Sequence, residues 1–402
     1  MTKEANIPRW FWLALALGAI IRIYLAVFTD GTADVRLWQR HARGVGKWGV
    51  VGYYQTSTWA NHPPVILTVE ALLFKASKAT GIPFRVLLRL PFAILDAGTT
   101  VLLLSLWRDK PWRFVLAAGY WLHPLAMIFS AYHGNTDSSV PFFVLLCLRF
   151  LTRGNIIAAG IVLGAGFWIK IPGVLAIPAL LLLPQDWRKK AIFLLIAEVT
   201  AFATYVPAML QDPGVVSANI FGYRGQLIAT TGDEPIWGSR VLLAMCTSIN
   251  WRTKHFEQIE FFMEHEWMLS LGLLLLITFL RRQERSAHEV CGTIGMCYTV
   301  FYAFNDHWAW QYFAWSVPFW FLLPKWFLIS SSALASAYVY SLYWLVCGNP
   351  WLLGKWDWVA HPHWPTIVLL FRDAAVLFFF LSACWFLVSE GAKHLGKRNK
   401  DL

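Results

Sequence analysis

Apolar stretches recur along almost the whole chain, and they constrain its fold more than any other feature of the sequence. Runs such as VLLLSLW and LGLLLLITFL carry no charge, and a helix needs about 20 apolar residues to cross a bilayer. A β-barrel would instead alternate apolar and polar residues in short segments. Only 14% of the 402 residues are charged, against about 25% in a soluble domain. The sequence therefore predicts an all-α polytopic membrane protein.

We count twelve predicted membrane spans, from residues 10–28 to residues 366–388. The basic turns WRDKPWR, TRGN, QDWRKK, RRQER and KHLGKRNK fall on one side if the spans alternate, and the positive-inside rule makes that side cytoplasmic. The alternation requires HPPVILTVEALLFKASK to lie on the outer surface as an interfacial helix. Both termini are then cytoplasmic, in a bacterial plasma membrane or an endoplasmic reticulum. We divide the chain into a membrane module, residues 1–210, and a long external loop with C-terminal spans, residues 211–402.

The net charge of +11 does not indicate nucleic-acid binding, because no basic tail or domain carries it. The charges collect in short loops at the ends of predicted helices, where membrane lipids are the expected partners. No metal-ligand spacing such as HExxH and no phosphate-cradling or dinucleotide motif occurs. We therefore expect no bound metal and no nucleotide-binding fold.

The polar segment after the first predicted span indicates an amphipathic helix that starts near Asp34. His41 shares one helical stripe with the apolar side chains at positions 37, 38, 45 and 48, and basic side chains cover the other side. Thr32 is a candidate N-cap, which places Asp34 in the first turn, where the helix dipole favours a carboxylate. Asp30, beside Gly31, is expected to be a turn residue. The alternative is a surface helix bound to lipid headgroups.

Four polar segments share the outer side in this topology: residues 29–83, YHGNTDSS, Lys170 with residues 211–266, and NDHWAWQ. Single residues have plain structural alternatives, namely capping for Asp137 and snorkelling to headgroups for Lys170. Their convergence indicates a site at the outer leaflet, in a cavity between helices and external loops. Besides Asp34, the candidate site residues are Arg22, Arg36, His133, Asn135, Asp137, Lys170, Arg224, His307, Gln311 and Tyr312.

Six segments, taken in order, resemble the GT-C integral-membrane glycosyltransferases over about residues 10–325. They are ADVRLWQRH, NHPP, RLPFAILDAG, HGNTD, WIKIPGVLAIP and FNDHWAWQYFAWSVP. The chain looks closest to the polyprenyl- or dolichyl-phosphate-mannose-dependent mannosyltransferases. These include the first mannosyltransferase of GPI-anchor synthesis and bacterial phosphatidylinositol-mannoside enzymes. The first segment is also similar to the first loop of dolichyl-phosphate-glucose-dependent glucosyltransferases. The resemblance implies a GT-C-like fold of about twelve membrane helices with interfacial helices in the first external loop.

The resemblance also implies a chemistry and assigns roles to the candidate residues. Asp34 matches the catalytic aspartate of the first external loop and would act as general base. His307 and Lys170, with Arg22, Arg36 and Arg224, would stabilise the leaving phosphate, and Asp137 would bind sugar or acceptor hydroxyls. Gln311 and Tyr312 match a late Gln-Tyr pattern. Several family members carry paired aspartates in the first loop, but residue 36 is Arg here, so no metal cofactor is expected.

The implied activity is inverting transfer of a sugar, mannose in the first place, from a polyprenyl-phosphate donor to a lipid-linked or glycan acceptor. A transporter or flippase of lipid-linked sugars is the alternative, and a binding subunit with a degenerate site is a third. A transporter should show internal repeats and broken helices near the midplane. We find no convincing repeat, and the polar residues gather on one side, which favours an enzyme.

Overall fold

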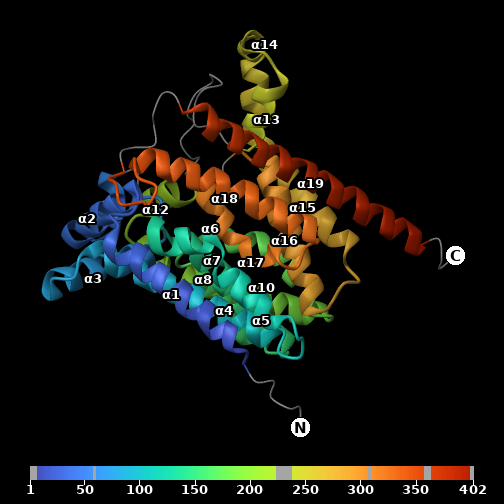
Figure 1. Cartoon of the computed structure of the whole chain (residues 1–402), viewed down its shortest axis with the longest axis horizontal. Coiled ribbons are helices and arrows are strands. Elements are labelled where there is room, and N and C mark those ends of the chain that lie inside the picture. Colours follow the sequence, from blue (N-terminus) through green and yellow to red (C-terminus); the bar gives the residue numbers. More distant parts are fainter. Residues whose placement is uncertain (1–6, 58–59, 223–237, 307–308, 357–363, 399–402) are drawn as a thin grey trace. The chain divides into compact units, whose positions relative to one another are not determined.

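The computed structural model describes residues 7–57, 60–222, 238–306, 309–356 and 364–398 (Figure 1). Within these ranges the regular structure is helical throughout and contains no strand, which confirms the predicted all-helical class. The chain divides into two compact units. The first comprises Met1–Gly173, Ala191–Tyr223 and Val346–Asp357, and the second comprises Val174–Lys190, Arg224–Leu345 and Trp358–Leu402. The predicted division at residue 210 stays a prediction.

The first unit contains the N-terminal helices and most of the predicted site. Its elements are α1 (Arg9–Phe28), α2 (Ala33–Thr56), α3 (Pro64–Thr80), α4 (Phe84–Leu106), α5 (Arg113–Trp121), α6 (Pro124–Met127), η1 (Ile128–His133), η2 (Thr136–Ser138), α7 (Ser139–Thr152), α8 (Ile156–Gly166), α11 (Val206–Met209) and α12 (Pro213–Ile220). Helix α10 (Trp187–Ala203) lies mostly in this unit, and η3 (Ile171–Ala176) crosses its boundary.

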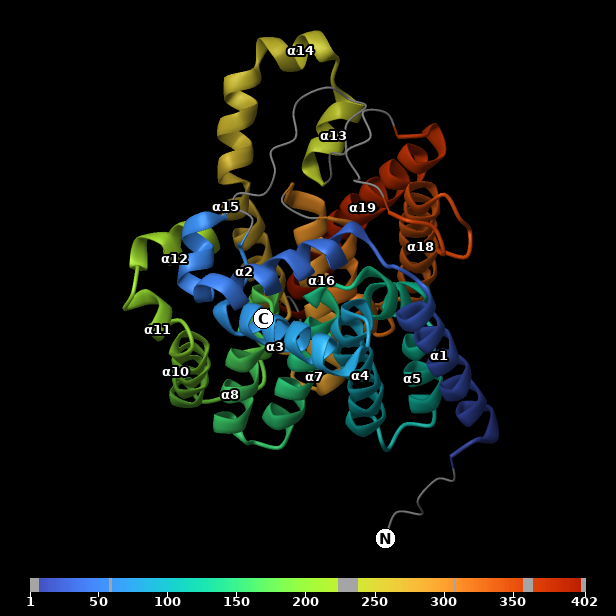
Figure 2. The ribbon, with the colours of Figure 1, turned by 90° about the vertical axis from the view of Figure 1, so that its left-hand side faces the viewer.

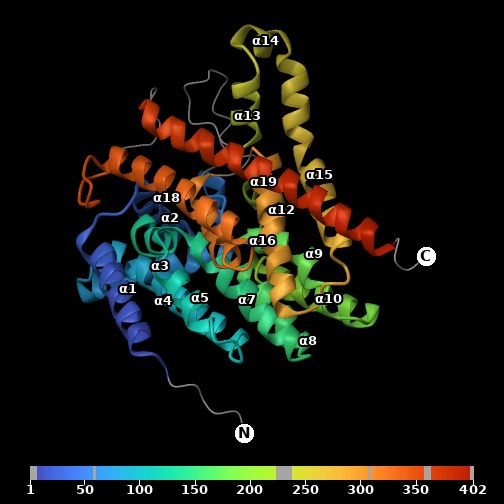
Figure 3. The same cartoon turned by 45° about the vertical axis from the view of Figure 1, so that its right-hand side comes forward.

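The second unit contains the later helices. Its elements are α9 (Ile177–Leu180), α13 (Ser239–Cys246), α14 (Ile249–Lys254), α15 (Phe256–Leu280), α16 (Ala287–Phe304), η4 (Trp310–Trp315), α17 (Val317–Trp320), α18 (Lys325–Cys347) and α19 (Thr366–Arg398). The last two residues of α18 belong to the first unit. Helix α16 packs against both α15 and α19 (Figure 3).

Fewer helices are long and apolar enough to cross a membrane than the twelve predicted spans. Among the described residues four qualify, namely α1, α4, α15 and α19 up to Gly396, and a fifth is added if α5 and the Pro124–His133 segment count as one span bent by 49°. The remaining helices are shorter than 18 residues or less apolar. Helix α3, predicted to be interfacial, is not among the candidate spans.

In the first unit, α1 packs on α4 and α5, and α2 packs along α3 (Figure 2). A buried ion pair joins two of the candidate spans: Arg22 on α1 lies 2.9 Å from Asp96 on α4, and the two side chains are 3% and 1% exposed. The guanidinium also donates to the Trp121 carbonyl at 2.8 Å, and the Tyr120 hydroxyl donates to Asp96 at 2.7 Å. Charges inside apolar helices are costly unless paired and hydrogen-bonded, so this network positions α1 against α4 and α5.

The Arg22–Asp96 pair yields a stability prediction. Asp96→Ala leaves a buried, uncompensated guanidinium and is expected to destabilise the protein by about 3–5 kcal/mol. The measurement is thermal unfolding in detergent, followed by tryptophan fluorescence.

The matched control is Asp109→Ala, which removes the carboxylate of the exposed Arg108–Asp109 pair and should leave the unfolding temperature unchanged. A double variant, Arg22→Met with Asp96→Leu, should recover much of the loss because it leaves no unpaired charge. Equal stability of Asp96→Ala and the unaltered protein would contradict the assigned role.

Candidate functional site

The N-terminus of α2 places Asp34 as the sequence predicts. The helix begins at Ala33, and the Thr32 hydroxyl oxygen accepts a hydrogen bond from the Asp34 backbone N–H at 3.3 Å. The predicted stripe is largely buried, since Trp38 and His41 are 1% and 0% exposed. The Thr32 hydroxyl also donates to the His133 carbonyl at 2.7 Å, so the helix cap connects two segments that lie far apart in the sequence.

The HGNTD segment interrupts the helical path, as its Gly-Asn pair predicts. Gly134 has φ of +75°, a conformation that favours glycine, and it separates η1 from η2. His133, Asn135 and Asp137 are all buried. The break therefore turns three polar side chains into the interior of the unit within five residues.

Asp34 lies at the centre of the polar cluster formed by these segments. Its Oδ2 accepts a hydrogen bond from the Asn135 amide at 2.9 Å and lies 3.1 Å from His133 Nε2. Burial raises the pKa of Asp34, but the attraction and hydrogen bonds of His133 and Asn135, aided by the charge of Lys170, outweigh it and hold the pKa below its usual value. Asp34 is therefore a carboxylate at neutral pH, and His133 Nε2 donates to it.

Asp137 and Lys170 form a second polar pair beside Asp34. The Lys170 Nζ lies 3.5 Å from Asp137 Oδ1, and the side chains are 13% and 1% exposed. Lys170 acts electrostatically on Asp34 as well. The predicted residues Asp34, His133, Asn135, Asp137 and Lys170 are thus brought together in one unit.

Two histidines that the candidate residues do not include complete the cluster. His41 Nδ1 lies 2.8 Å from the Tyr53 hydroxyl, and the His62 ring packs against Trp38 in a tilted arrangement with 4.2 Å between ring centroids. Burial, with the charge of Arg40, lowers the pKa of His41 to about 4. Burial, with Lys170 and His41, lowers the pKa of His62 well below its usual value. Both imidazoles are neutral at pH 7 and can exchange hydrogen bonds with hydroxyl groups.

A cavity of about 520 Å³ opens at the first turn of α2. Its wall carries three cationic side chains and one carboxylate. The lining residues are Asp30, Val35, Arg36, Gln39, Ser77, Pro83, Phe84, Arg85 and Lys355. Because cations outnumber the carboxylate by three to one, the cavity favours an anion.

Arg89 and two glycines set the spacing between the α2 turn and the HGNTD segment. The buried Arg89 guanidinium donates to the carbonyls of Ala26 and Thr29 at 2.8 and 2.7 Å and to the Tyr132 carbonyl at 3.2 Å. A Cβ on Gly134 would lie 2.6 Å from Val35 Cγ2. Gly31, with φ of +78°, is equally close, because a Cβ there would lie 2.8 Å from the Tyr132 carbonyl oxygen.

The other predicted site residues lie elsewhere or outside the described ranges. Arg22 makes no contact with the Asp34 cluster, because its guanidinium is occupied by Asp96. Arg36 lines the cavity and donates a hydrogen bond to the Trp356 carbonyl. His307 and Arg224 lie outside the described residues.

Gln311 and Tyr312 belong to the second unit. Tyr312 stacks on Trp315 with 4.1 Å between ring centroids, and its carbonyl accepts a hydrogen bond from the Tyr302 hydroxyl at 2.7 Å. Gln311 is partly buried. Within the described part of the chain, no three His, Cys, Asp or Glu side chains gather closely enough to hold a metal ion.

Sequence reasoning missed His62, Arg85, Arg89 and Lys355. A signal existed for His62 in the NHPP motif, since Pro63 and Pro64 fix the backbone directly after it. Arg89 sits in an otherwise apolar stretch, where a charged residue has functional or structural importance by default. Lys355 carries no local signal.

Comparison with known proteins adds no family assignment. No protein-family model matches the chain, and no curated protein matches it either.

The lowered pKa of Asp34 predicts how stability depends on pH. A carboxylate with a lower pKa in the folded state stabilises the fold fully above its unfolded pKa, about 3.9, and this contribution is lost as pH falls through the folded value. Asp34→Asn is therefore expected to reduce stability at pH 7 by about 1 kcal/mol, and the difference should shrink below about pH 4. Thermal unfolding of both proteins from pH 7 to pH 3 measures it.

The control for this experiment is Asp30→Asn in the same turn. Asp30 is 48% exposed and lies 3.8 Å from Arg85, so its loss should change stability little at any pH. A difference between Asp34→Asn and the unaltered protein that stays constant across the pH range would show that Asp34 does not have the lowered pKa.

Proposed function

We propose that the protein is an inverting glycosyltransferase that moves a sugar from a polyprenyl-phosphate donor to a hydroxyl group, with Asp34 as general base. The long apolar helices support a membrane location, where such a donor resides. The resemblance to GT-C mannosyltransferases supports mannose as the sugar and a lipid-linked or glycan acceptor. In the predicted topology the reaction takes place on the outer or lumenal side.

The environment of Asp34 is the observation that carries this proposal. Both hydrogen bonds to its carboxylate fall on Oδ2, and Oδ1 accepts none from the residues that the structure describes. The side chain is 24% exposed. An ionised carboxylate with one oxygen held in place and the other open is suited to accept a proton from a bound hydroxyl.

The reaction balances with Asp34 alone as the proton acceptor. The acceptor oxygen forms a bond to the anomeric carbon as its proton moves to Asp34 Oδ1, while the bond from that carbon to the phosphate oxygen breaks. Polyprenyl phosphate leaves with the bonding electrons, and Asp34 returns the proton to water. The products are the glycoside with inverted configuration and polyprenyl phosphate.

The leaving phosphate needs charge stabilisation more than a proton, and the cavity at the first turn of α2 supplies cations. Arg36, Arg85 and Lys355 line it, and Lys170 lies on the side of the Asp34 cluster. Donors already in place where negative charge develops are worth several kcal/mol in a water-poor site.

The first turn of α2 separates the base from these cations. Asp34 and Arg36 are two positions apart, so they point about 200° apart around the helix axis. Asp34 meets His133 and Asn135, whereas Arg36 lines the cavity. An inverting displacement needs the nucleophile and the leaving group on opposite sides of the sugar carbon, and a sugar over the α2 N-terminus would have this arrangement.

Asp34→Asn tests the assignment of the base directly. Removal of the general base is expected to lower kcat by about 10²–10⁴-fold while donor binding is retained, because Asn keeps the size of the side chain. The measurement is mass-spectrometric product formation by purified protein in detergent, with donor binding determined separately.

The matched control is Asp109→Asn, which makes the same chemical change at an exposed aspartate outside the Asp34 cluster and the cavity. It should retain product formation close to that of the unaltered protein. Near-normal turnover of Asp34→Asn would remove Asp34 as the base.

The choice of donor gives a further prediction. Purified protein supplied with polyprenyl-phosphate mannose and an extract of membrane lipids should consume the donor without any nucleotide sugar. Parallel reactions with polyprenyl-phosphate glucose identify the preferred sugar from the mass of the product.

A strict need for a nucleotide sugar would contradict the proposal. Movement of intact lipid-linked sugar across vesicle membranes, with no new glycosidic product, would support the transporter alternative instead.

A further inference from the structure

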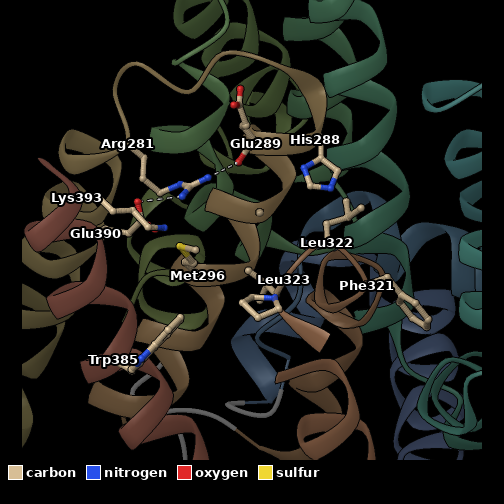
Figure 4. A pocket seen from close by; sticks show the side chains of 12 residues that line it. Arg281, His288, Glu289, Met296, Phe321, Leu322, Leu323, Trp385, Glu390 and Lys393 are labelled. Carbon is tan, nitrogen blue, oxygen red and sulfur yellow. Dashed lines mark hydrogen bonds and ion pairs between the residues drawn. The ribbon is translucent and has the colours of Figure 1, made fainter. Parts of the chain in front are cut away.

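The second unit contains a cavity of about 350 Å³ at the ends of two candidate membrane spans (Figure 4). Arg281 directly follows α15, and Glu390 and Lys393 lie near the end of α19. The first turns of α16 and the segment after α17 complete the wall. The lining residues are Arg281, His288, Glu289, Gly292, Met296, Phe321, Leu322, Leu323, Pro324, Trp385, Glu390 and Lys393.

One side of this cavity is ionic. The Glu390 carboxylate forms ion pairs with Arg281 at 3.1 Å and with Lys393 at 2.7 Å. Arg281 is further fixed by a 2.8 Å hydrogen bond from its Nε to the Thr293 hydroxyl. Two cations share one carboxylate, so this group keeps one net positive charge. Lys393 is 63% exposed and is free to turn toward a ligand.

Glu289 adds a second carboxylate to the cavity wall, but its charge is engaged by the N-terminus of α16 and not by Arg281 or Lys393. Its carboxylate accepts hydrogen bonds from the backbone N–H groups of Ser286 at 2.8 Å and Arg285 at 3.0 Å, which complete the capping box of α16. It is turned away from Arg281 (Figure 4). The N-terminus of α16 adds a favourable dipole for an anion at the same end of the cavity.

The other side of the cavity is apolar. Met296, Leu323 and Trp385 lie beyond the ionic group (Figure 4). Trp385 is 46% exposed, and tryptophan is favoured at membrane interfaces, where one part of a ligand is polar and the rest is hydrocarbon. A cation-bearing end joined to an apolar wall is complementary to a phosphate group that carries a hydrocarbon chain.

We infer that this cavity binds an anionic phospholipid, with its phosphate at Arg281 and Lys393 and an acyl chain along Met296 and Trp385. The RRQER turn between α15 and α16 and the basic tail are predicted to be cytoplasmic, and basic pockets between membrane helices on that side bind anionic headgroups. The inference is independent of the proposed transferase activity, because none of its residues takes part in that reaction.

Gly292 provides a way to close the cavity without removing a charge. A Cβ at this position would meet only ordinary contacts, 3.5 Å to the Leu322 carbonyl oxygen and 3.9 Å to Arg281 Nη2. Gly292→Leu therefore has room at Cβ, and the rest of its side chain occupies the cavity. Lys393→Gln, at an exposed position, is the second variant and carries little risk of misfolding.

The experiment measures phospholipid binding to purified full-length protein in nanodiscs. Phosphatidylglycerol is titrated into phosphatidylcholine discs, and bound lipid is counted by native mass spectrometry. The unaltered protein should retain phosphatidylglycerol in preference to phosphatidylcholine. Lys393→Gln should weaken this preference about fivefold, the effect of one cation near a membrane surface, and Gly292→Leu should abolish it.

The matched control is Lys254→Gln, which removes the same charge from the exposed end of α14 in the same unit and should bind phosphatidylglycerol normally. Equal loss in Lys254→Gln, or no preference for phosphatidylglycerol in the unaltered protein, would overturn the inference. A separate arm adds inorganic phosphate alone. If phosphate displaces phosphatidylglycerol at millimolar concentration, the cavity is a site for free phosphate and the assignment to phospholipid is wrong.

Discussion

The buried guanidinium of Arg89 is the interaction on which the candidate site depends. The last carbonyls of any helix lack partners within the helix, and at the end of α1 the groups of Ala26 and Thr29 are satisfied by Arg89. The same guanidinium donates to the Tyr132 carbonyl, next to His133. Five residues beyond Thr29 comes Asp34. One side chain from α4 therefore fixes the relative position of the two segments that supply the carboxylate and its donors.

The backbones of the two segments also approach closely, and this brings Asp34 within hydrogen-bond distance of its donors. Gly31 and Gly134 both have positive φ, and a Cβ on either would lie under 3 Å from atoms of the facing segment. Larger residues would push α2 away from η1. Because the 2.9 Å contact between Asn135 and Asp34 tolerates little displacement, the glycines are needed for Asp34 to have a lowered pKa.

The sequence predicted those features of the site that depend only on residues close to one another in the chain. The Thr32 cap, the buried stripe of α2 and the break at Gly134 follow from propensities of a few neighbouring residues. Pairings across long sequence distances do not follow in this way. Arg22 and Asp96 are separated by 74 positions. The hydropathy of the sequence does not distinguish an arginine that snorkels to the headgroups from one that is paired in the interior. The twelve predicted spans are not confirmed for a related reason, because apolar segments such as residues 156–168 and 172–184 form helices shorter than 18 residues, Ile156–Gly166 and Ile171–Leu180.

The neutrality of His41 and His62 bears on the proposed binding of a sugar at this site. If either imidazole were charged beside Asp34, it would compete with a substrate hydroxyl for the carboxylate. Burial and the charges of Arg40 and Lys170 keep both imidazoles neutral. The Lys170 ammonium lies 3.5 Å from the Asp137 carboxylate. Neutral imidazoles beside an aromatic ring suit polyhydroxyl ligands, since they offer hydrogen bonds at little desolvation cost. In the proposed reaction, neutral hydrogen-bonding groups would lie on the side of the sugar and cations at Arg36, which suits a donor that carries its only negative charge on the leaving group.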